Sequence, residues 1–189
     1  MIRRWMTHSA HTRSDAELIA RVLEGHADAF APLVDRHQAA LYRYARGMGL
    51  DPDGAEDMVQ DCFVKAYVAL RECRRPEHFR TWLFRILRNC CLDHLKNVRQ
   101  RALPLDAVAA TDPMLHARGA VDLAHELDDA LARLSPLLRE AFLLKHEAGY
   151  TYEEIAGITD SSPSAVKMRV HRARDELRAA LALEPAEAM

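Results

Sequence analysis

Apolar side chains recur at helical spacing along nearly the whole chain, and no segment shows the sustained apolar–polar alternation of a strand. The first run of apolar positions follows Ser14 and Glu17, which stand three residues apart as in a helix-capping box, and Gly25 ends it. Further runs predict helices over about 27–46, 55–71, 79–99, 122–133, 136–147, 152–158 and 163–183. The fold class is therefore expected to be all-α.

Proline and glycine divide this helical pattern. Residues 51–54, with the sequence Asp-Pro-Asp-Gly, predict a turn before the third helix. Between 101 and 121 the apolar residues lose their period and two prolines and a glycine interrupt them, which is typical of a flexible linker. We therefore expect two small helical domains, 14–100 and 122–183, joined by this linker, with the second ending in a helix-turn-helix. Residues 1–13 and 184–189 are expected to be tails.

The helix-turn-helix is the sharpest local signal. Thr151 and Glu154 form a second capping box, which opens a short helix. After a turn at 159–161, Ser162 supplies a helix cap and Pro163 occupies the first helical position, where its missing N–H costs nothing. Two short helices joined by so few residues are typical of this motif.

The second helix of the motif separates its residue types by face. At 100° per residue, Val166, Val170, Ala173 and Leu177 share one face and predict the core side. Small, polar and basic side chains occupy the remaining surface, which suits a helix that enters the major groove of DNA. The alternative is an ordinary helical hairpin with a charged surface.

The helix expected over 79–99 and the loop before it are strongly basic. Residues 71–101 contain nine basic and three acidic side chains, a charge of +6 within a chain whose net charge is −2. Phe79 and Trp82 stand among these cations, and cations beside aromatic rings suit single-stranded DNA. The alternatives are a solvated helix face and, for Trp82, a place in the core.

An acidic segment near the start of the third helix carries Glu56, Asp57, Gln60 and Asp61. The chain has no H-E-x-x-H motif, no glycine-rich phosphate loop and no G-x-S-x-G elbow. We therefore expect no enzymatic activity, no metal site and no cofactor. The acidic face is interpreted as a docking surface for a basic partner.

Composition adds three expectations. The 189 residues are 49% hydrophobic and 29% charged, which excludes a wholly disordered chain. No apolar run is long enough for a membrane span or a secretory signal, so a cytoplasmic location is expected. The four cysteines form no C-x-x-C pair and are interpreted as buried thiols, with a redox role for the adjacent Cys90 and Cys91 left open.

Four motifs in this order resemble the bacterial RNA polymerase sigma factors of the extracytoplasmic-function (ECF) type. The resemblance covers about 15–183. The segment 55–63 is similar to the polymerase-docking segment, and 79–83 with Ile86 and Asn89 to the promoter-melting segment. The segment 134–144 is similar to the start of the second domain, and 150–156 with 166–174 to its helix-turn-helix.

The resemblance implies a role for each segment. The polymerase-docking residues would be Asp57, Gln60 and Asp61, which would meet the β′ clamp helices of core RNA polymerase. The β subunit would be a further contact of the chain. The residues that would bind the melted −10 element of promoter DNA, including a base flipped out of the stack, are Arg74, Arg75, His78, Phe79, Arg80, Trp82, Arg85 and Arg88. Those that would read the −35 element are Ser162, Ser164, Ala165, Lys167, Met168, Arg169, His171 and Arg172.

The resemblance also implies that the linker over 101–121 threads through the polymerase toward the RNA exit path. An anti-sigma factor is an expected partner, and no small-molecule substrate is expected. A free-standing helix-turn-helix regulator with a helical sensor domain is the main alternative. That alternative leaves the acidic segment and the basic loop without a role. A third possibility, a helical protein that only binds other proteins, leaves the basic recognition helix unexplained.

Overall fold

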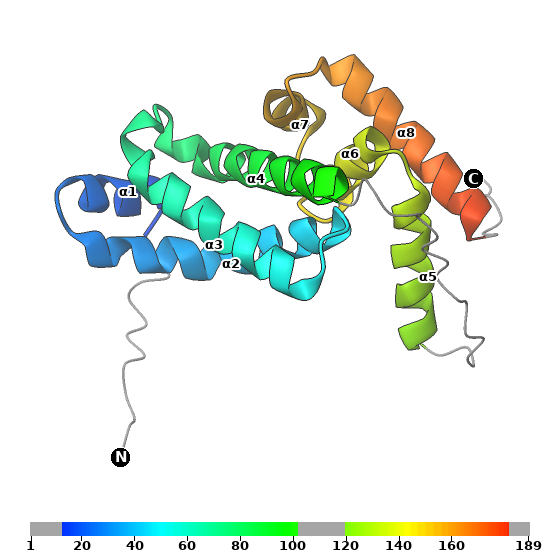
Figure 1. Ribbon diagram of the computed structural model, residues 1–189. Coiled ribbons are helices and arrows are strands. Elements are labelled where there is room, and N and C mark those ends of the chain that lie inside the picture. The colour runs from blue at the N-terminus through cyan, green and yellow to red at the C-terminus, as the bar shows by residue number, and fades with distance from the viewer. Residues whose placement is uncertain (1–12, 102–119, 182–189) are drawn as a thin grey trace.

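The computed structural model describes residues 13–101 and 120–181, and within these ranges it is helical throughout, with no strand. Figure 1 shows the helices of the first domain lying side by side and those of the second grouped at one end of them. The α-helices are α1 (Asp15–Leu23), α2 (Ala31–Gly47), α3 (Pro52–Val68), α4 (Phe79–Arg101), α5 (Ala120–Arg133), α6 (Pro136–His146), α7 (Tyr152–Thr159) and α8 (Pro163–Ala180).

Short 3₁₀ turns complete the first domain at Ala27–Phe30, Leu70–Glu72 and Pro76–His78. No helix among the described residues is both long enough and apolar enough to cross a bilayer. The expected linker and both expected tails lie almost wholly outside the described residues, since α4 ends at Arg101 and α5 begins at Ala120.

The turn expected at 51–54 is a helix start instead. The Asp51 carboxylate accepts a hydrogen bond of 2.8 Å from the backbone N–H of Gly54, so Asp51 is the cap of α3 and Pro52 its first residue. Asp, Pro and Gly are turn formers, but the same side chains also begin helices. The prediction therefore placed the start of this helix three residues too late.

Helix α4 runs through the middle of the molecule (Figure 1), and buried side chains lie on more than one of its sides. Leu83 and Leu87 point into the first domain, as the spacing predicted, and neither is exposed. Phe84 is equally buried, and its ring meets those of Tyr44 from α2 and Tyr150 from the second domain at centroid distances of 5.6 and 5.2 Å. The imperfect apolar stripe of this helix thus reflects two contact faces.

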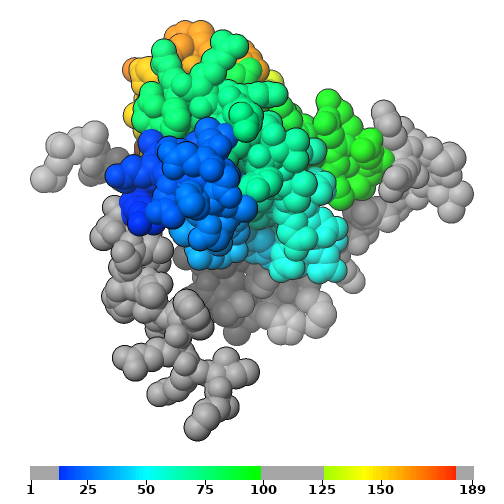
Figure 2. Space-filling model, turned by 90° about the vertical axis from the view of Figure 1, so that its left-hand side faces the viewer, coloured from blue at the N-terminus to red at the C-terminus, as the bar shows by residue number. Residues whose placement is uncertain are grey.

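The two domains share one continuous apolar core. Helix α4 packs against α7, and α2 packs against α6, so the second domain rests on the first and is not held by a linker alone. In Figure 2 the yellow and orange surface of the second domain borders the green surface of the first. The sequence predicted two helical domains, which are confirmed, but it did not predict this contact.

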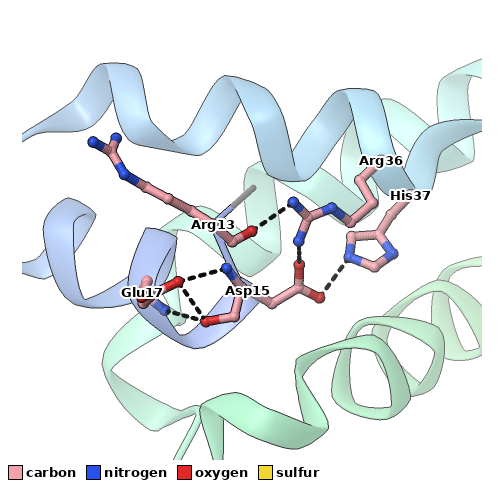
Figure 3. Close-up of polar contacts among 6 residues, drawn as sticks. Arg13, Asp15, Glu17, Arg36 and His37 are labelled. Carbon is pink, nitrogen blue, oxygen red and sulfur yellow. Dashed lines mark hydrogen bonds and ion pairs between the residues drawn. The ribbon is translucent and has the colours of Figure 1, made fainter. Parts of the chain in front are cut away.

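A polar cluster fastens α1 to α2 (Figure 3). The Asp15 carboxylate bonds to the guanidinium of Arg36 and, at 2.8 Å, to Nε2 of the buried His37. Arg36 also donates to the carbonyl of Arg13 at 2.8 Å, while Ser14 and Glu17 form the predicted capping box at the start of α1. Partial burial alone would raise the pKa of Asp15, but His37 and Arg36 outweigh it and lower the pKa below its ordinary value.

We expect Asp15→Asn to lower the free energy of unfolding by about 1 kcal/mol at pH 7, because it removes the charge that holds both partners. The pKa of Asp15 is lower in the folded state, so this contribution is complete well above the ordinary carboxyl pKa of about 4 and is lost as the pH falls through the folded pKa. Urea unfolding at pH 7, 4 and 3 measures it.

Glu24→Gln, at the exposed end of the same helix, serves as the control and should leave unfolding unchanged. A difference between wild type and Asp15→Asn that stays constant as the pH falls below 4 would contradict the assigned role of this carboxylate.

Candidate nucleic-acid interface

Helix α8 has the buried face that its spacing predicted. Val166, Val170, Ala173 and Leu177 are at most 5% exposed and pack into the second domain. The other face is open. The expected −35 residues that lie exposed there are Ser162, Ser164, Lys167, Met168, His171 and Arg172, and those that are half-buried are Ala165 and Arg169.

Local hydrogen bonds shape the start of this helix. The Ser162 hydroxyl accepts from the backbone N–H of Ala165 at 3.2 Å and lies 3.1 Å from the hydroxyl of Ser164. Arg169 reaches back to donate to the Ser161 hydroxyl at 2.8 Å, and Asp160 ends α7 in the left-handed conformation. These hydrogen bonds fix the turn between the two helices, and they place two hydroxyls at the exposed tip of α8.

A second surface lies around Trp82 on the first domain. Trp82 is half-buried: it packs against the core and also lines a pocket. The pocket has a volume of ≈ 320 Å³ and is lined by Glu72, Cys73, Arg74, Arg75, His78, Thr81, Trp82, Arg85 and Gly157. It combines an aromatic face with several cations.

The expected −10 residues divide into three groups. Arg74, Arg75 and His78 are exposed at the rim of the Trp82 pocket. Phe79 is completely buried beside His37, with ring centroids 5.6 Å apart, and offers no surface to DNA in this conformation. Three arginines of α4, by contrast, reach across to the second domain, and they are Arg80, Arg85 and Arg88.

Sequence reasoning missed the residues of the second domain that meet these arginines. Glu140 is only 2% exposed although it is ionisable, and Tyr150 is 1% exposed. A signal for Glu140 was present, because it stands one turn before the buried Leu144 on the same face of α6. A carboxylate at a core position calls for a partner, which the sequence alone does not name.

The acidic segment forms an exposed stripe along α3. Glu56, Asp57, Gln60 and Asp61 all lie open to solvent, beside a groove of ≈ 450 Å³ between α2 and α3. The stripe continues into exposed apolar residues that the sequence analysis did not single out, Val64 at 64% and Val68 at 78% exposure. Carboxylates next to open apolar side chains are typical of a surface that binds another protein.

Comparison with known protein families matches two segments to two consecutive models. Residues 33–101 match "Sigma-70 region 2", and residues 124–177 match "Sigma-70, region 4". The chain is also 33% identical over 167 residues to "ECF RNA polymerase sigma factor SigM" of Mycobacterium tuberculosis, a match that covers 88% of this chain and 84% of that protein. This chain belongs to the ECF sigma factors. It is a promoter-recognition subunit for transcription initiation, as the resemblance implied.

Solved structures show the same fold. The sigma factor CnrH in complex with the cytosolic domain of CnrY superposes with a TM-score of 0.68 at 31% identity, over 92% of this chain and 100% of that one. RpoE of Bartonella quintana, in complex with the anti-sigma factor NepR, gives a TM-score of 0.68 at 28% identity, over 82% of this chain and 98% of that one. Two helical domains are therefore common to this sigma factor and both neighbours.

The four thiols of this sigma factor are all buried, as expected. Burial, followed by the neighbouring Cys90, raises the pKa of the Cys91 thiol to about 12, and burial also raises the pKa values of Cys62 and Cys73. Cys90 lies 3.3 Å from the ammonium of Lys65 but is only 4% exposed. Enclosed thiols react slowly, so the burial of Cys90 and Cys91 disfavours the redox role left open for them.

We expect Ellman's reagent at pH 8 to leave the native thiols unmodified over minutes, and to titrate four in 6 M guanidinium chloride. Ser164→Cys, which places a thiol at an exposed position on α8, is the positive control and should add one fast-reacting group. Rapid modification of Cys90 or Cys91 in the native protein would restore the redox interpretation.

Proposed function

We propose that this sigma factor directs core RNA polymerase to its promoters through three surfaces and performs no covalent chemistry. The exposed face of α8 reads the −35 element, the basic loop and α4 bind the melted −10 element, and the α3 stripe docks on the β′ clamp helices. The observation that carries the proposal is that the acidic surface of α3 and the two basic surfaces, on the loop with α4 and on α8, lie on separate parts of one helical scaffold.

The −35 assignment is supported by the exposure of α8. Lys167 and Arg172 stand open to solvent where they can hold phosphates, while the hydroxyls of Ser162 and Ser164 and the half-buried Arg169 lie nearer the turn. Phosphate contacts position a protein on the duplex, and contacts to base edges specify the sequence. We assign Lys167 to the first task and Arg169 to the second.

The −10 assignment is supported by the Trp82 pocket. Unstacked bases bind to aromatic faces, and the strand backbone binds to cations, and this pocket supplies both. Arg74, Arg75 and His78 at its rim are free of the second domain and would make the first contacts with a single strand.

The docking assignment is supported by the α3 stripe. Its exposed carboxylates and amide can pair with cations of a basic helix pair. The exposed Val64 and Val68 next to them can pack against the apolar parts of the same side chains. The two structural neighbours are described with CnrY and with the anti-sigma factor NepR. By analogy, we infer that an anti-sigma factor also binds this chain.

Run-off transcription with core polymerase tests the proposal. Wild-type protein should produce new transcripts from defined start sites on genomic promoter fragments. Gln60→Ala combined with Asp61→Ala should weaken the complex with core polymerase at least tenfold on gel filtration, because it removes a charge and an amide from the centre of the stripe.

The matched control is Asp35→Ala, which removes one exposed charge from α2 outside the stripe and should leave the complex intact. An unchanged complex for the double variant would overturn the docking assignment. Sequence-specific duplex binding by the free protein, with no binding to polymerase, would favour the free-standing regulator instead.

Lys167→Ala and Arg169→Ala should have different effects on transcription. Loss of Lys167 should weaken transcription from all responsive promoters, because phosphate contacts carry no sequence information. Loss of Arg169 should change the preference among −35 variants by about tenfold or more, because one base contact contributes about 1–3 kcal/mol of discrimination. Transcription from a library of −35 sequences measures both.

Glu176→Gln on the same helix is the control and should leave the preference profile unchanged, because this exposed residue lies more than two turns from the tip of α8. Wild-type transcription levels for Lys167→Ala, together with a wild-type preference profile for Arg169→Ala, would overturn the assignment of α8 to the −35 element.

A further inference from the structure

Phe79 supports the Trp82 pocket without lining it. It is the first residue of α4 and is completely buried. Its ring packs against that of Trp82, with the centroids 5.9 Å apart and the planes inclined by 37°. Trp82 lines the pocket and Phe79 does not, so any contact that fixes Phe79 also acts on the pocket from behind.

The ring of Phe79 also meets that of His37 in α2. The two centroids lie 5.6 Å apart and the planes are inclined by 64°, close to the edge-to-face arrangement that aromatic rings prefer. His37 is only 5% exposed, although its side chain is polar. Two ring contacts therefore connect His37, through Phe79, to the aromatic wall of the pocket.

The His37 ring is in turn held by Asp15 of α1 (Figure 3). One oxygen of the carboxylate lies 2.8 Å from Nε2 of His37, and the other bonds to the guanidinium of Arg36. A carboxylate can only accept hydrogen bonds, so Nε2 carries the proton of this contact. Because a hydrogen bond is directional, it fixes the orientation of the imidazole ring that faces Phe79.

The helix that carries Asp15 also supports the basic loop. Helix α1 packs against both 3₁₀ turns, Leu70–Glu72 and Pro76–His78. The pocket residues at 73–75 lie between these turns. The Asp15 cluster therefore supports two sides of the pocket, the aromatic side through His37 and the loop through α1.

We propose that Asp15 and His37 are positioning residues for the binding of the melted strand, because they hold Phe79 and, through it, the ring of Trp82 in the wall of the pocket. The inference rests on the proposed −10 role of this pocket and adds two residues that do not line it. A base stacks most favourably on a ring that is already in place, since ordering a side chain during binding costs affinity.

A role in stability alone makes a different prediction. Ser14→Ala removes the capping box at the start of the same helix, and loss of such a cap destabilises a protein. It leaves the side chains of Asp15, His37 and Phe79 unchanged. Ser14→Ala is therefore the matched control, because it weakens α1 without removing a member of the chain of contacts that leads to Trp82.

The first measurement is the fluorescence of Trp82. Trp5→Phe leaves Trp82 as the only tryptophan, and all variants are made in this background. His37→Gln keeps a donor for Asp15 but removes the ring, whereas Asp15→Ala keeps the ring but removes its anchor. Both should shift the emission of Trp82 to longer wavelength and increase its quenching by acrylamide, because the indole gains contact with water. Ser14→Ala should do neither.

The second measurement is the affinity for single-stranded DNA. The anisotropy of a fluorescein-labelled strand of random sequence, about 20 nucleotides long, reports binding to the full chain at low salt. His37→Gln and Asp15→Ala should each weaken binding about fivefold, which corresponds to the loss of one aromatic contact. Ser14→Ala should bind the strand as the parent does, and Trp82→Ala should bind it at least as weakly as His37→Gln.

Unchanged Trp82 emission in both His37→Gln and Asp15→Ala would overturn the positioning role, and so would an equal shift in Ser14→Ala. Shifted emission with undiminished strand binding would overturn the contribution to binding, provided that Trp82→Ala weakens it. If Trp82→Ala binds as tightly as the parent, the proposed −10 role of the pocket fails, and the emission of Trp82 alone decides the positioning. Circular dichroism verifies folding, and Asp15→Asn replaces Asp15→Ala if the latter does not fold.

Discussion

The arrangement of this molecule depends on a helix that must be buried on two sides while carrying a row of arginines. Leu83 and Leu87 of α4 complete the core of the first domain, whereas Phe84 meets Tyr150 of the second. A helix with one apolar stripe could not join two domains in this way. The arginines beside Phe84 are consequently placed at a domain boundary, where each of them bonds to a group of the second domain.

The separation of acidic and basic side chains lets a chain with almost no net charge bind a polyanion. The net charge is only −2, yet α3 presents carboxylates and the α4 region presents cations on separate surfaces of the same domain. The carboxylates of the stripe repel DNA from this face, and on the proposed docking role they would attract a basic protein. Docking on polymerase would cover this repulsive face and leave the basic one for the promoter, so the two binding steps assist each other.

Local features of the fold could be predicted from the sequence, and the contact between the domains could not. The capping boxes at Ser14 and Thr151 and the buried face of α8 follow from spacing within a few turns of chain, and all three are present. The start of α3 was missed because Asp51 and Pro52 suit a turn as well as a cap. The bond between Arg88 and Glu140 spans 52 residues, and no local pattern specifies such a pair.

The surfaces differ in how far the contact between the domains leaves them open. The α3 stripe and the open face of α8 are exposed, and so are Arg74, Arg75 and His78 beside Trp82. Arg80, Arg85 and Arg88 instead bond to groups of the second domain. On the proposed assignment, polymerase and duplex DNA would bind surfaces that are already exposed, and the melted strand would first meet the exposed cations of the loop, because the arginines of α4 already have bonding partners.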